Sequence, residues 1–151
     1  MGDAKNDDLR VSFDSRLKLK FLGSQVTTDA GLLAYRELDE TLGLTEMAPD
    51  VLEDSRVGSN KQHGLLPLLR QSIYSRLAGY EDVNDAERLS VDPAMRHVVG
   101  GRATLPEKQV ASTSEVGRFE TQTLSTKSNL TALMDLSGDS IDKAHRCKPL
   151  K

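Results

Sequence analysis

The chain has 151 residues, which is enough for one domain with a hydrophobic core. Its 23 acidic and 20 basic residues give a formal net charge of −3, which excludes a protein-wide positive field, so any DNA contact must come from local basic patches. The single cysteine, Cys147, excludes an internal disulfide, and the sequence has no apolar run near the roughly 20 residues of a membrane helix, so we expect a cytoplasmic protein.

The first predicted element is a short N-terminal strand, after a lead of residues 1–9 that we expect to be disordered. From Val11 to Phe21 apolar and polar residues alternate, a period of two that is typical of a strand or a short hairpin. Its polar side carries Arg16, Lys18 and Lys20. Two interpretations stay open for these residues: a sheet edge protected by charge, or a stripe that contacts DNA phosphates.

Beyond this strand the pattern is helical. Asp92 is suited to cap a helix that Pro93 begins, Ser112 stands three residues before Glu115 as in a capping box, and Gly43 is suited to a helix end. Helical segments are predicted at about residues 28–42, 45–52, 64–77, 85–89, 92–99, 112–123 and 126–145. The sequence therefore predicts a mainly α fold over residues 10–146, in which these segments make about five to six helices, followed by a tail at residues 147–151.

Two of these segments have apolar stripes that predict which side is buried. The segment at 64–77 has the widest stripe and is predicted to be central, with these residues inward: Leu65, Leu66, Leu69, Ile73 and Leu77. Arg70 and Arg76 then face outward. In the last segment the residues predicted to face inward are Leu130, Leu133, Met134 and Ile141.

The first candidate for DNA contact is Arg118, on the outward side of the capped helix at 112–123. An arginine there can bind a phosphate or the edge of a guanine. The alternative is a surface arginine paired with Glu115 or Glu120, which is common on exposed helices. Further candidates of the same kind are Arg70, Arg76 and Lys61.

Two acidic groups resemble metal sites, because hard cations bind carboxylate oxygens: Glu81, Asp82 and Asp85, and then Asp135, Asp139 and Asp142. The first group lacks the Gly-rich turn of a calcium loop, and the second fits a solvated helix face. The three histidines are scattered, without the spacing of a zinc site. We therefore predict no catalytic residue, no metal ligand and no cofactor for this chain.

Five short strings, in a fixed order, carry a family resemblance: ThrThrAspAlaGlyLeuLeu (27–33), LeuLeuArgGln (68–71), GlyTyrGluAspValAsnAsp (79–85), AspProAlaMetArg (92–96) and GlyArgPheGlu (117–120). Together they resemble the N-terminal region of bacterial insertion-sequence DDE transposases of group 1. The resemblance implies an enzyme family in which an RNase H-like domain holds two magnesium ions with an acidic triad. The string LysProLeuLys (148–151) resembles the linker before the first of those acids, so the resemblance implies a fragment truncated before the catalytic domain.

The resemblance also implies a function. We expect an N-terminal transposase fragment that takes part in DNA transposition through binding of transposon ends, self-association or both, and that is not catalytic alone. Its implied partners are DNA and either a second copy or a full-length transposase, with no membrane. The alternatives are a stand-alone DNA-binding regulator of transposition and a non-functional remnant.

Overall fold

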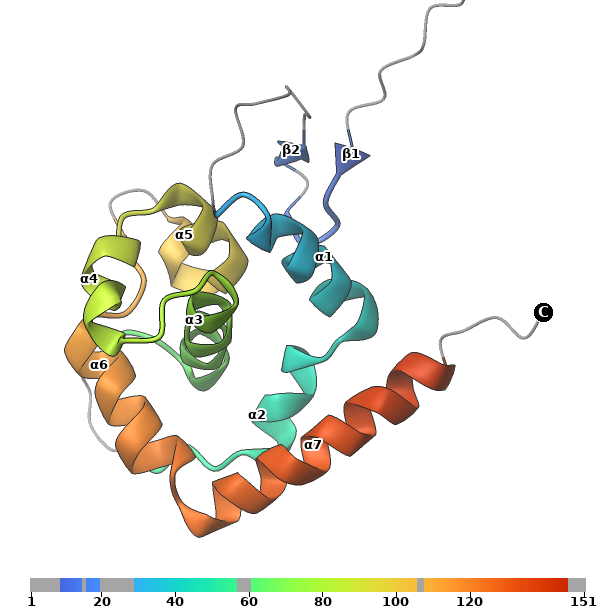
Figure 1. Cartoon of the computed structure of the whole chain (residues 1–151), viewed down its shortest axis with the longest axis vertical. Coiled ribbons are helices and arrows are strands. Elements are labelled where there is room, and N and C mark those ends of the chain that lie inside the picture. Colours follow the sequence, from blue (N-terminus) through green and yellow to red (C-terminus); the bar gives the residue numbers. More distant parts are fainter. Residues whose placement is uncertain (1–8, 15, 20–28, 57–60, 106–107, 147–151) are drawn as a thin grey trace, which may run out of the picture.

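The computed structural model describes residues 9–14, 16–19, 29–56, 61–105 and 108–146. The architecture is mainly helical, as the sequence predicts (Figure 1). Seven α-helices occur in this part of the chain, against about five to six predicted: α1 (Leu32–Leu42), α2 (Ala48–Val51), α3 (Leu65–Leu77), α4 (Ala86–Leu89), α5 (Pro93–Val99), α6 (Thr113–Arg118) and α7 (Lys127–Arg146). Between them lie three 3-10 turns and a π-helical segment: η1 (Thr45–Met47), η2 (Val83–Asp85), η3 (Gly101–Thr104) and η4 (Phe119–Leu124). No helix within these ranges is both long and apolar enough to cross a bilayer.

Of the two forms predicted for residues Val11 to Phe21, a continuous strand is not formed in the described residues. A short antiparallel hairpin is found at this end of the chain, in which β1 (Leu9–Arg10), which precedes Val11, pairs with β2 (Lys18–Leu19). Between them the Asp14 carboxylate accepts a hydrogen bond from the backbone N–H of Arg16 at 3.0 Å and two from its guanidinium at 2.9 and 2.7 Å. An aspartate that bonds the backbone two residues on favours a turn, and this turn interrupts the alternation that predicted a longer strand.

The helix boundaries follow capping residues that the sequence identifies. At the start of α5 the Asp92 carboxylate accepts from the backbone N–H of Met95 at 2.7 Å. At the start of α6 the Ser112 hydroxyl accepts from the backbone N–H of Glu115 at 3.4 Å. Gly43 ends α1 at a φ of 62°, a left-handed conformation that glycine adopts without the steric penalty of a side chain.

Helix α3 lies at the centre of the fold, as predicted, with α1, α2, α5 and α6 around it (Figure 1). Two buried apolar clusters pack against it, one containing Tyr74 and the other containing Leu68 and Leu69. The surrounding elements complete the first cluster with Leu32, Leu89, Met95, Val98 and Val99, and the second with Ala48, Leu52, Ala86, Val116 and Phe119. Burial of a large apolar side chain contributes roughly 1.5–3 kcal/mol, so these clusters hold the helices around α3.

The buried face of α3 differs from the predicted apolar stripe. Ile73 and Leu77 are exposed, whereas Arg70, Gln71 and Ser72 are buried. The prediction that Arg70 faces outward is therefore wrong. Each of the three buried polar side chains forms a hydrogen bond with a residue outside α3, and because buried polar groups must be paired, these partners set the rotation of the helix.

A buried carboxylate, Asp39, joins α1, η1 and α3. It accepts hydrogen bonds from the backbone N–H of Thr45 at 2.7 Å, from the Thr45 hydroxyl at 2.6 Å and from the Tyr74 hydroxyl at 3.1 Å. The guanidinium groups of Arg36 and Arg70 lie 3.5 and 3.6 Å from the same carboxylate. Burial raises the pKa of the Tyr74 hydroxyl above its usual range, and the neighbouring Asp39 raises it further, while burial beside Arg36 lowers the pKa of Arg70.

The last helix, α7, is held to the body through Asn129. The side-chain oxygen of Asn129 accepts from the backbone N–H of Glu53 at 2.8 Å, and its nitrogen donates to the carbonyls of Glu53 and Thr123, both at 2.9 Å. The apolar residues of α7 are less buried than predicted, since Leu130, Met134 and Ile141 are 50%, 76% and 60% exposed. The inward prediction for these three residues is wrong, because the side that meets the body carries Asn129 and the partly buried residues Ala132, Leu133 and Leu136.

A surface ion pair joins α3 to η4. The guanidinium of Arg76 donates two hydrogen bonds to the Glu120 carboxylate, at 2.8 and 3.0 Å, and the Ser72 hydroxyl donates a third at 2.6 Å. The hydrogen bonds from Arg76 lower the pKa of Glu120, and the Ser72 bond lowers it further. The same pair raises the pKa of Arg76. Arg76, a predicted DNA contact, is thus paired with a carboxylate of its own chain.

Replacing Asp39 by alanine is expected to lower the free energy of unfolding by about 3–5 kcal/mol, because two buried guanidinium groups then lose the carboxylate between them. Urea denaturation of the wild type and Asp39→Ala measures this loss. The matched control is Asp135→Ala on the exposed side of α7, which is expected to change stability by no more than about 0.5 kcal/mol. Equal stability of the two variants would contradict a structural role for Asp39.

The Arg76–Glu120 pair is expected to give a pH-dependent contribution to stability. Because the folded state lowers the pKa of Glu120, the contribution is present above the usual glutamate pKa and is lost as the pH falls through the lowered value. Glu120→Gln should therefore be less stable than the wild type by at most about 1 kcal/mol at neutral pH, with the difference shrinking in acid. Urea titrations across the pH range measure it, with the exposed Glu81→Gln as control; a difference that grows in acid would contradict the assignment.

Candidate nucleic-acid interface

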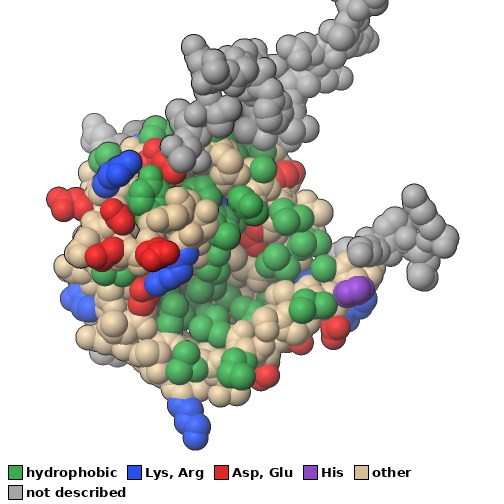
Figure 2. Space-filling model, viewed as in Figure 1, with side chains coloured by type: hydrophobic (Ala, Val, Ile, Leu, Met, Phe, Trp, Pro, Cys, Tyr) green, Lys and Arg blue, Asp and Glu red, His purple; other side chains and the backbone are tan. Residues whose placement is uncertain are grey.

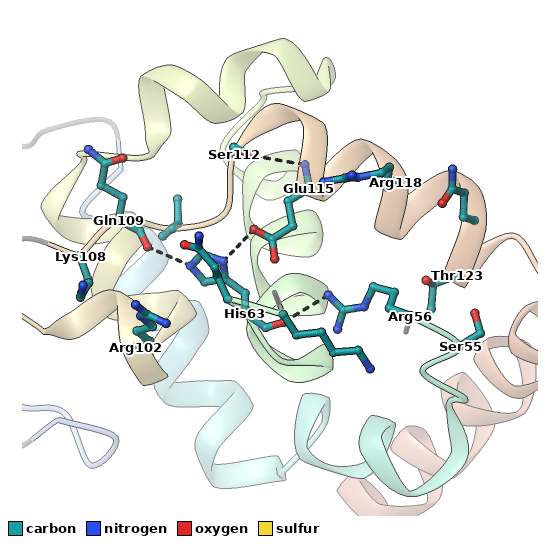
Figure 3. Close-up of a pocket in the computed structure, with 14 residues that line it drawn as sticks. Ser55, Arg56, His63, Arg102, Lys108, Gln109, Ser112, Glu115, Arg118 and Thr123 are labelled. Atoms are coloured by element: carbon teal, nitrogen blue, oxygen red, sulfur yellow. Dashed lines mark hydrogen bonds and ion pairs between the residues drawn. The ribbon is translucent and has the colours of Figure 1, made fainter. Parts of the chain in front are cut away.

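A basic pocket of about 770 Å³ lies where the segments that precede α3 and α6 meet the α6–η4 segment (Figure 3). Five of its lining residues are basic: Arg56, Lys61, Arg102, Lys108 and Arg118. Among the described lining residues the one carboxylate is that of Glu115. The chain as a whole is acidic, so the fold concentrates positive charge at this place.

A buried amide positions the wall of the pocket. The Gln71 side chain on α3 donates to the carbonyl of Ala111 at 2.8 Å and accepts from the backbone N–H of Ala111 at 2.9 Å. Gln71 is almost fully buried, and a buried amide left without these partners is costly. The pair fixes the segment that leads from Lys108 into α6, and therefore fixes where Lys108 and Arg118 lie relative to α3.

His63 lies in the middle of the pocket and binds the carboxylate of Glu115, which therefore does not pair with the basic groups (Figure 3). Its Nδ1 lies 2.9 Å from the Glu115 carboxylate, and its Nε2 lies 3.0 Å from the carbonyl oxygen of Gln109. A carbonyl only accepts, so the contact with Gln109 is satisfied when Nε2 carries a hydrogen. This pair leaves Glu115 unavailable to the arginines and lysines around it.

Two of the basic residues are held by a neighbouring aspartate. The guanidinium of Arg56 binds the Asp54 carboxylate at 2.8 Å, and the Lys61 ammonium lies 3.4 Å from it. The hydrogen bonds from Arg56 lower the pKa of Asp54 to about 2, so the carboxylate is ionised at neutral pH. Arg56 also stacks over the buried ring of Phe119, 5.6 Å from its centroid. Arg56 is thus fixed in the floor of the pocket.

The other three basic side chains, those of Arg102, Lys108 and Arg118, form no ion pair with any described residue. Arg118 is exposed, and its Nε donates to the carbonyl of Ser114 at 3.1 Å. The expected alternative, a pair with Glu115 or Glu120, is not found in the described part of the chain: Glu115 binds His63, and Glu120 binds Arg76. Within the described ranges, no carboxylate therefore competes with an anionic ligand for these three cations.

A buried hydroxyl also lines this pocket. Thr123 is fully buried, and its Oγ1 has no hydrogen-bond partner among the described residues. Buried hydroxyls are normally paired, so this oxygen is suited to a group that enters the pocket.

The predicted DNA contacts fall into different places. Arg118 and Lys61 line the pocket, Arg76 binds Glu120, and Arg70 is buried. Arg16 is exposed but paired with Asp14. The side chain of Lys18 and all of Lys20 lie outside the described residues, so the proposed phosphate stripe stays a prediction.

Sequence reasoning missed three lining residues, Arg56, Arg102 and Lys108. Arg56 lies between α2 and α3, whereas Arg102 and Lys108 both lie between α5 and α6, so 46 residues separate Arg56 from Arg102. In the sequence each of them is a basic residue in a polar connection. Such residues are frequent in surface loops, so they do not stand out. The tertiary fold, by bringing these loops around His63, is what makes them a group.

The acidic groups singled out in the sequence do not make a metal site in the described structure. Within the described ranges, no three His, Cys, Asp or Glu side chains come together as metal ligands. The Asp82 carboxylate instead accepts from the backbone N–H of Asn84 at 2.9 Å and begins η2. Asp135, Asp139 and Asp142 are exposed on α7.

A family model described as transposase DDE domain group 1 matches residues 9–149. No curated protein and no solved structure matches the chain. Because the family match extends over nearly the whole sequence and includes the basic pocket, the chain belongs to the transposase DDE domain group 1 family.

Proposed function

We propose that this chain takes part in DNA transposition by holding the phosphate backbone of DNA in the basic pocket. The observation that carries the proposal is the convergence of five basic side chains around a carboxylate that His63 has already engaged. Arg102, Lys108 and Arg118 supply positive charge that no described carboxylate engages, and Arg56 and Lys61 supply further positive charge beside Asp54. Cations arranged in this way neutralise phosphates and release the counterions of DNA.

The composition of the pocket favours duplex backbone over the bases of a single strand. Proteins that grip single strands use exposed aromatic rings on which bases stack. Among the described residues that line the pocket there is no Phe, Tyr or Trp, and Phe119 lies buried beneath Arg56. The Thr123 hydroxyl, which has no described partner, is suited to donate to a phosphate oxygen.

The described residues do not fit the magnesium site that the family resemblance implies. Two magnesium ions need clustered carboxylates, and the described acidic side chains do not cluster. The pocket itself offers one carboxylate among its described residues, and that carboxylate is bound to His63. We therefore propose a DNA-contacting role, without phosphodiester chemistry, for the described part of the chain.

Arg118→Ala is the variant that tests the proposal. The experiment measures binding of the full chain to fluorescein-labelled duplex DNA by anisotropy at several salt concentrations. For the wild type, the binding constant is expected to fall steeply with salt. A plot of its logarithm against the logarithm of the salt concentration should have a slope of about −0.9 per neutralised phosphate. Removing Arg118 should reduce the magnitude of this slope by about 1. At low salt the loss in affinity should be about five-fold, which corresponds to about 1 kcal/mol.

The control is Arg88→Ala. Arg88 is an exposed arginine outside the pocket, with its guanidinium 5.5 Å from the ring centroid of Tyr80. Its removal deletes the same charge and should leave the salt slope nearly unchanged. Equal effects of the two variants would mean that the pocket has no special role, and no binding by the wild type at low salt would refute DNA contact.

A further inference from the structure

The place of the Thr123 hydroxyl in the basic pocket narrows the kind of phosphate that the pocket suits. Thr123 is fully buried in the wall of the pocket, and its Oγ1 has no hydrogen-bond partner among the described residues. The phosphates of a continuous duplex lie on a convex surface, where exposed side chains such as that of Arg118 meet them. A buried hydroxyl is suited instead to a group that projects from the DNA into the pocket.

The hydroxyl of Thr123 differs from its neighbours along the chain. The hydroxyl of Thr121 donates to the carbonyl oxygen of Gly117, and that of Ser125 donates to the carbonyl oxygen of Thr121. This bond to the carbonyl four residues earlier is a common pairing of such side chains in helices. Thr123 lies between them in the π-helical segment η4 and does not form it. Because π-helical turns are rare and occur frequently at functional sites, this departure marks Thr123 as a ligand contact.

His63 divides the pocket into two parts in the view of Figure 3. On one side of it lie Arg102 and Lys108. On the other side lie Arg56, Arg118 and Thr123. Cations therefore line both parts, and the buried hydroxyl belongs to one of them. The volume of about 770 Å³ lies within the range of roughly 300–1,000 Å³ of sites that hold a small molecule, so the pocket has room for more than one phosphate of a strand.

The end of a DNA strand has the chemistry that matches the part of the pocket around Thr123. A terminal phosphate monoester carries a charge of about −1.5 to −2 at neutral pH and has three strong acceptor oxygens. Arg118 has no described carboxylate partner. Three N–H groups of the Arg56 side chain are engaged by Asp54 and the His63 carbonyl, and a guanidinium has more than these. Two cations and a hydroxyl thus offer donors to the three oxygens.

A second hollow of the molecule does not suit an anion. Figure 2 shows apolar side chains gathered in the space that α1, α2, α3 and α7 border. Moving a charged group from water onto apolar surface without a partner costs free energy. The described lining of the basic pocket, in contrast, has five basic side chains, and its one carboxylate is bound to His63. The chemistry of the two surfaces therefore directs a phosphate to the basic pocket.

We propose that the pocket receives the end of a DNA strand, with the terminal phosphate monoester at Thr123 and Arg118. The next phosphate of the strand, an ordinary diester, then lies on the other side of His63, at Arg102 and Lys108. This inference rests on the proposed contact with DNA and adds a preference for phosphorylated ends. Hydrogen bonds from charged donors to a phosphate are stronger than those between neutral groups, and the monoester accepts more of them than a diester does.

The first experiment compares three unlabelled duplexes of one sequence as competitors for a fluorescein-labelled duplex bound to the full chain. One has hydroxyl groups at all its ends, one has 5′-phosphates and one has 3′-phosphates. One of the two phosphorylated duplexes is expected to bind about ten-fold more tightly than the hydroxyl duplex. Equal affinity of all three would overturn this inference, while the salt slope lost in Arg118→Ala would still support the DNA contact. A wild type that binds no duplex at low salt would refute both.

The second experiment tests the role of Thr123 with Thr123→Val, which removes the hydroxyl and keeps the shape of the side chain. The phosphorylated duplex should lose most of its advantage, and binding of the hydroxyl duplex should stay unchanged. Because the hydroxyl has no described partner, the variant should unfold at a Tm no lower than that of the wild type. The control is Thr121→Val, on the exposed side of η4, which should keep the full preference. An equal loss for both duplexes in Thr123→Val, or no loss for either, would overturn the assignment.

Two further measurements separate a strand end from other sources of the same phosphate. Arg102→Ala should weaken binding of the hydroxyl and phosphorylated duplexes by the same factor, because Arg102 lies in the part of the pocket assigned to the internal phosphate. Thymidine 5′-monophosphate has a monoester but no second phosphate, so it should compete at least about ten-fold less well than the phosphorylated duplex. Competition by the free nucleotide as strong as that by the duplex would contradict a site for strand ends.

Discussion

The fold depends on the buried ion pairs and hydrogen bonds of Asp39. A carboxylate and two guanidinium groups removed from water are costly to bury, and they are tolerated when they are paired and hydrogen-bonded. Thr45 and Tyr74 supply the additional hydrogen bonds to Asp39, so α1, η1 and α3 satisfy these charges together. Phe13 covers the same cluster from the N-terminal segment, with its ring centroid 4.8 Å from the Arg36 guanidinium. The cluster therefore favours this arrangement, because separating α1 from η1 and α3 would remove Thr45, Tyr74 and Arg70 from the Asp39 carboxylate.

Two buried amide side chains, those of Gln71 and Asn129, position other parts of the molecule relative to this cluster. Gln71 is one residue from Arg70 on α3, so the helix rotation that buries Arg70 also aims Gln71 at the backbone of Ala111. That contact places one wall of the basic pocket. Asn129 acts in the same way at the start of α7, where it bonds Glu53 and Thr123. The amide fixes which side of α7 meets the body, and so which side remains exposed.

Ion pairs within the chain also explain how an acidic protein presents a basic pocket. Glu115 is engaged by His63, Glu120 by Arg76 and Asp54 by Arg56. Each pairing removes a carboxylate from competition for the pocket's other cations, and Arg102, Lys108 and Arg118 remain without a partner in the described ranges. Net charge governs long-range attraction, whereas binding of a phosphate is decided within a few ångströms. The net charge of −3 is therefore compatible with a local anion site.

Residue patterns alone predict the mainly α fold, the helix starts at Asp92 and Ser112, the end of α1 at Gly43 and the family. These features depend on local chemistry or on residue order, both of which the sequence contains. Tertiary structure alone decided that Arg70 is buried, that Met134 is exposed and that Arg56, Arg102 and Lys108 meet around His63. Apolar periodicity shows which side of a helix is suited to burial, but a buried polar partner on another element can rotate that helix. Loops far apart in sequence become neighbours only through the packing of the helices that they connect.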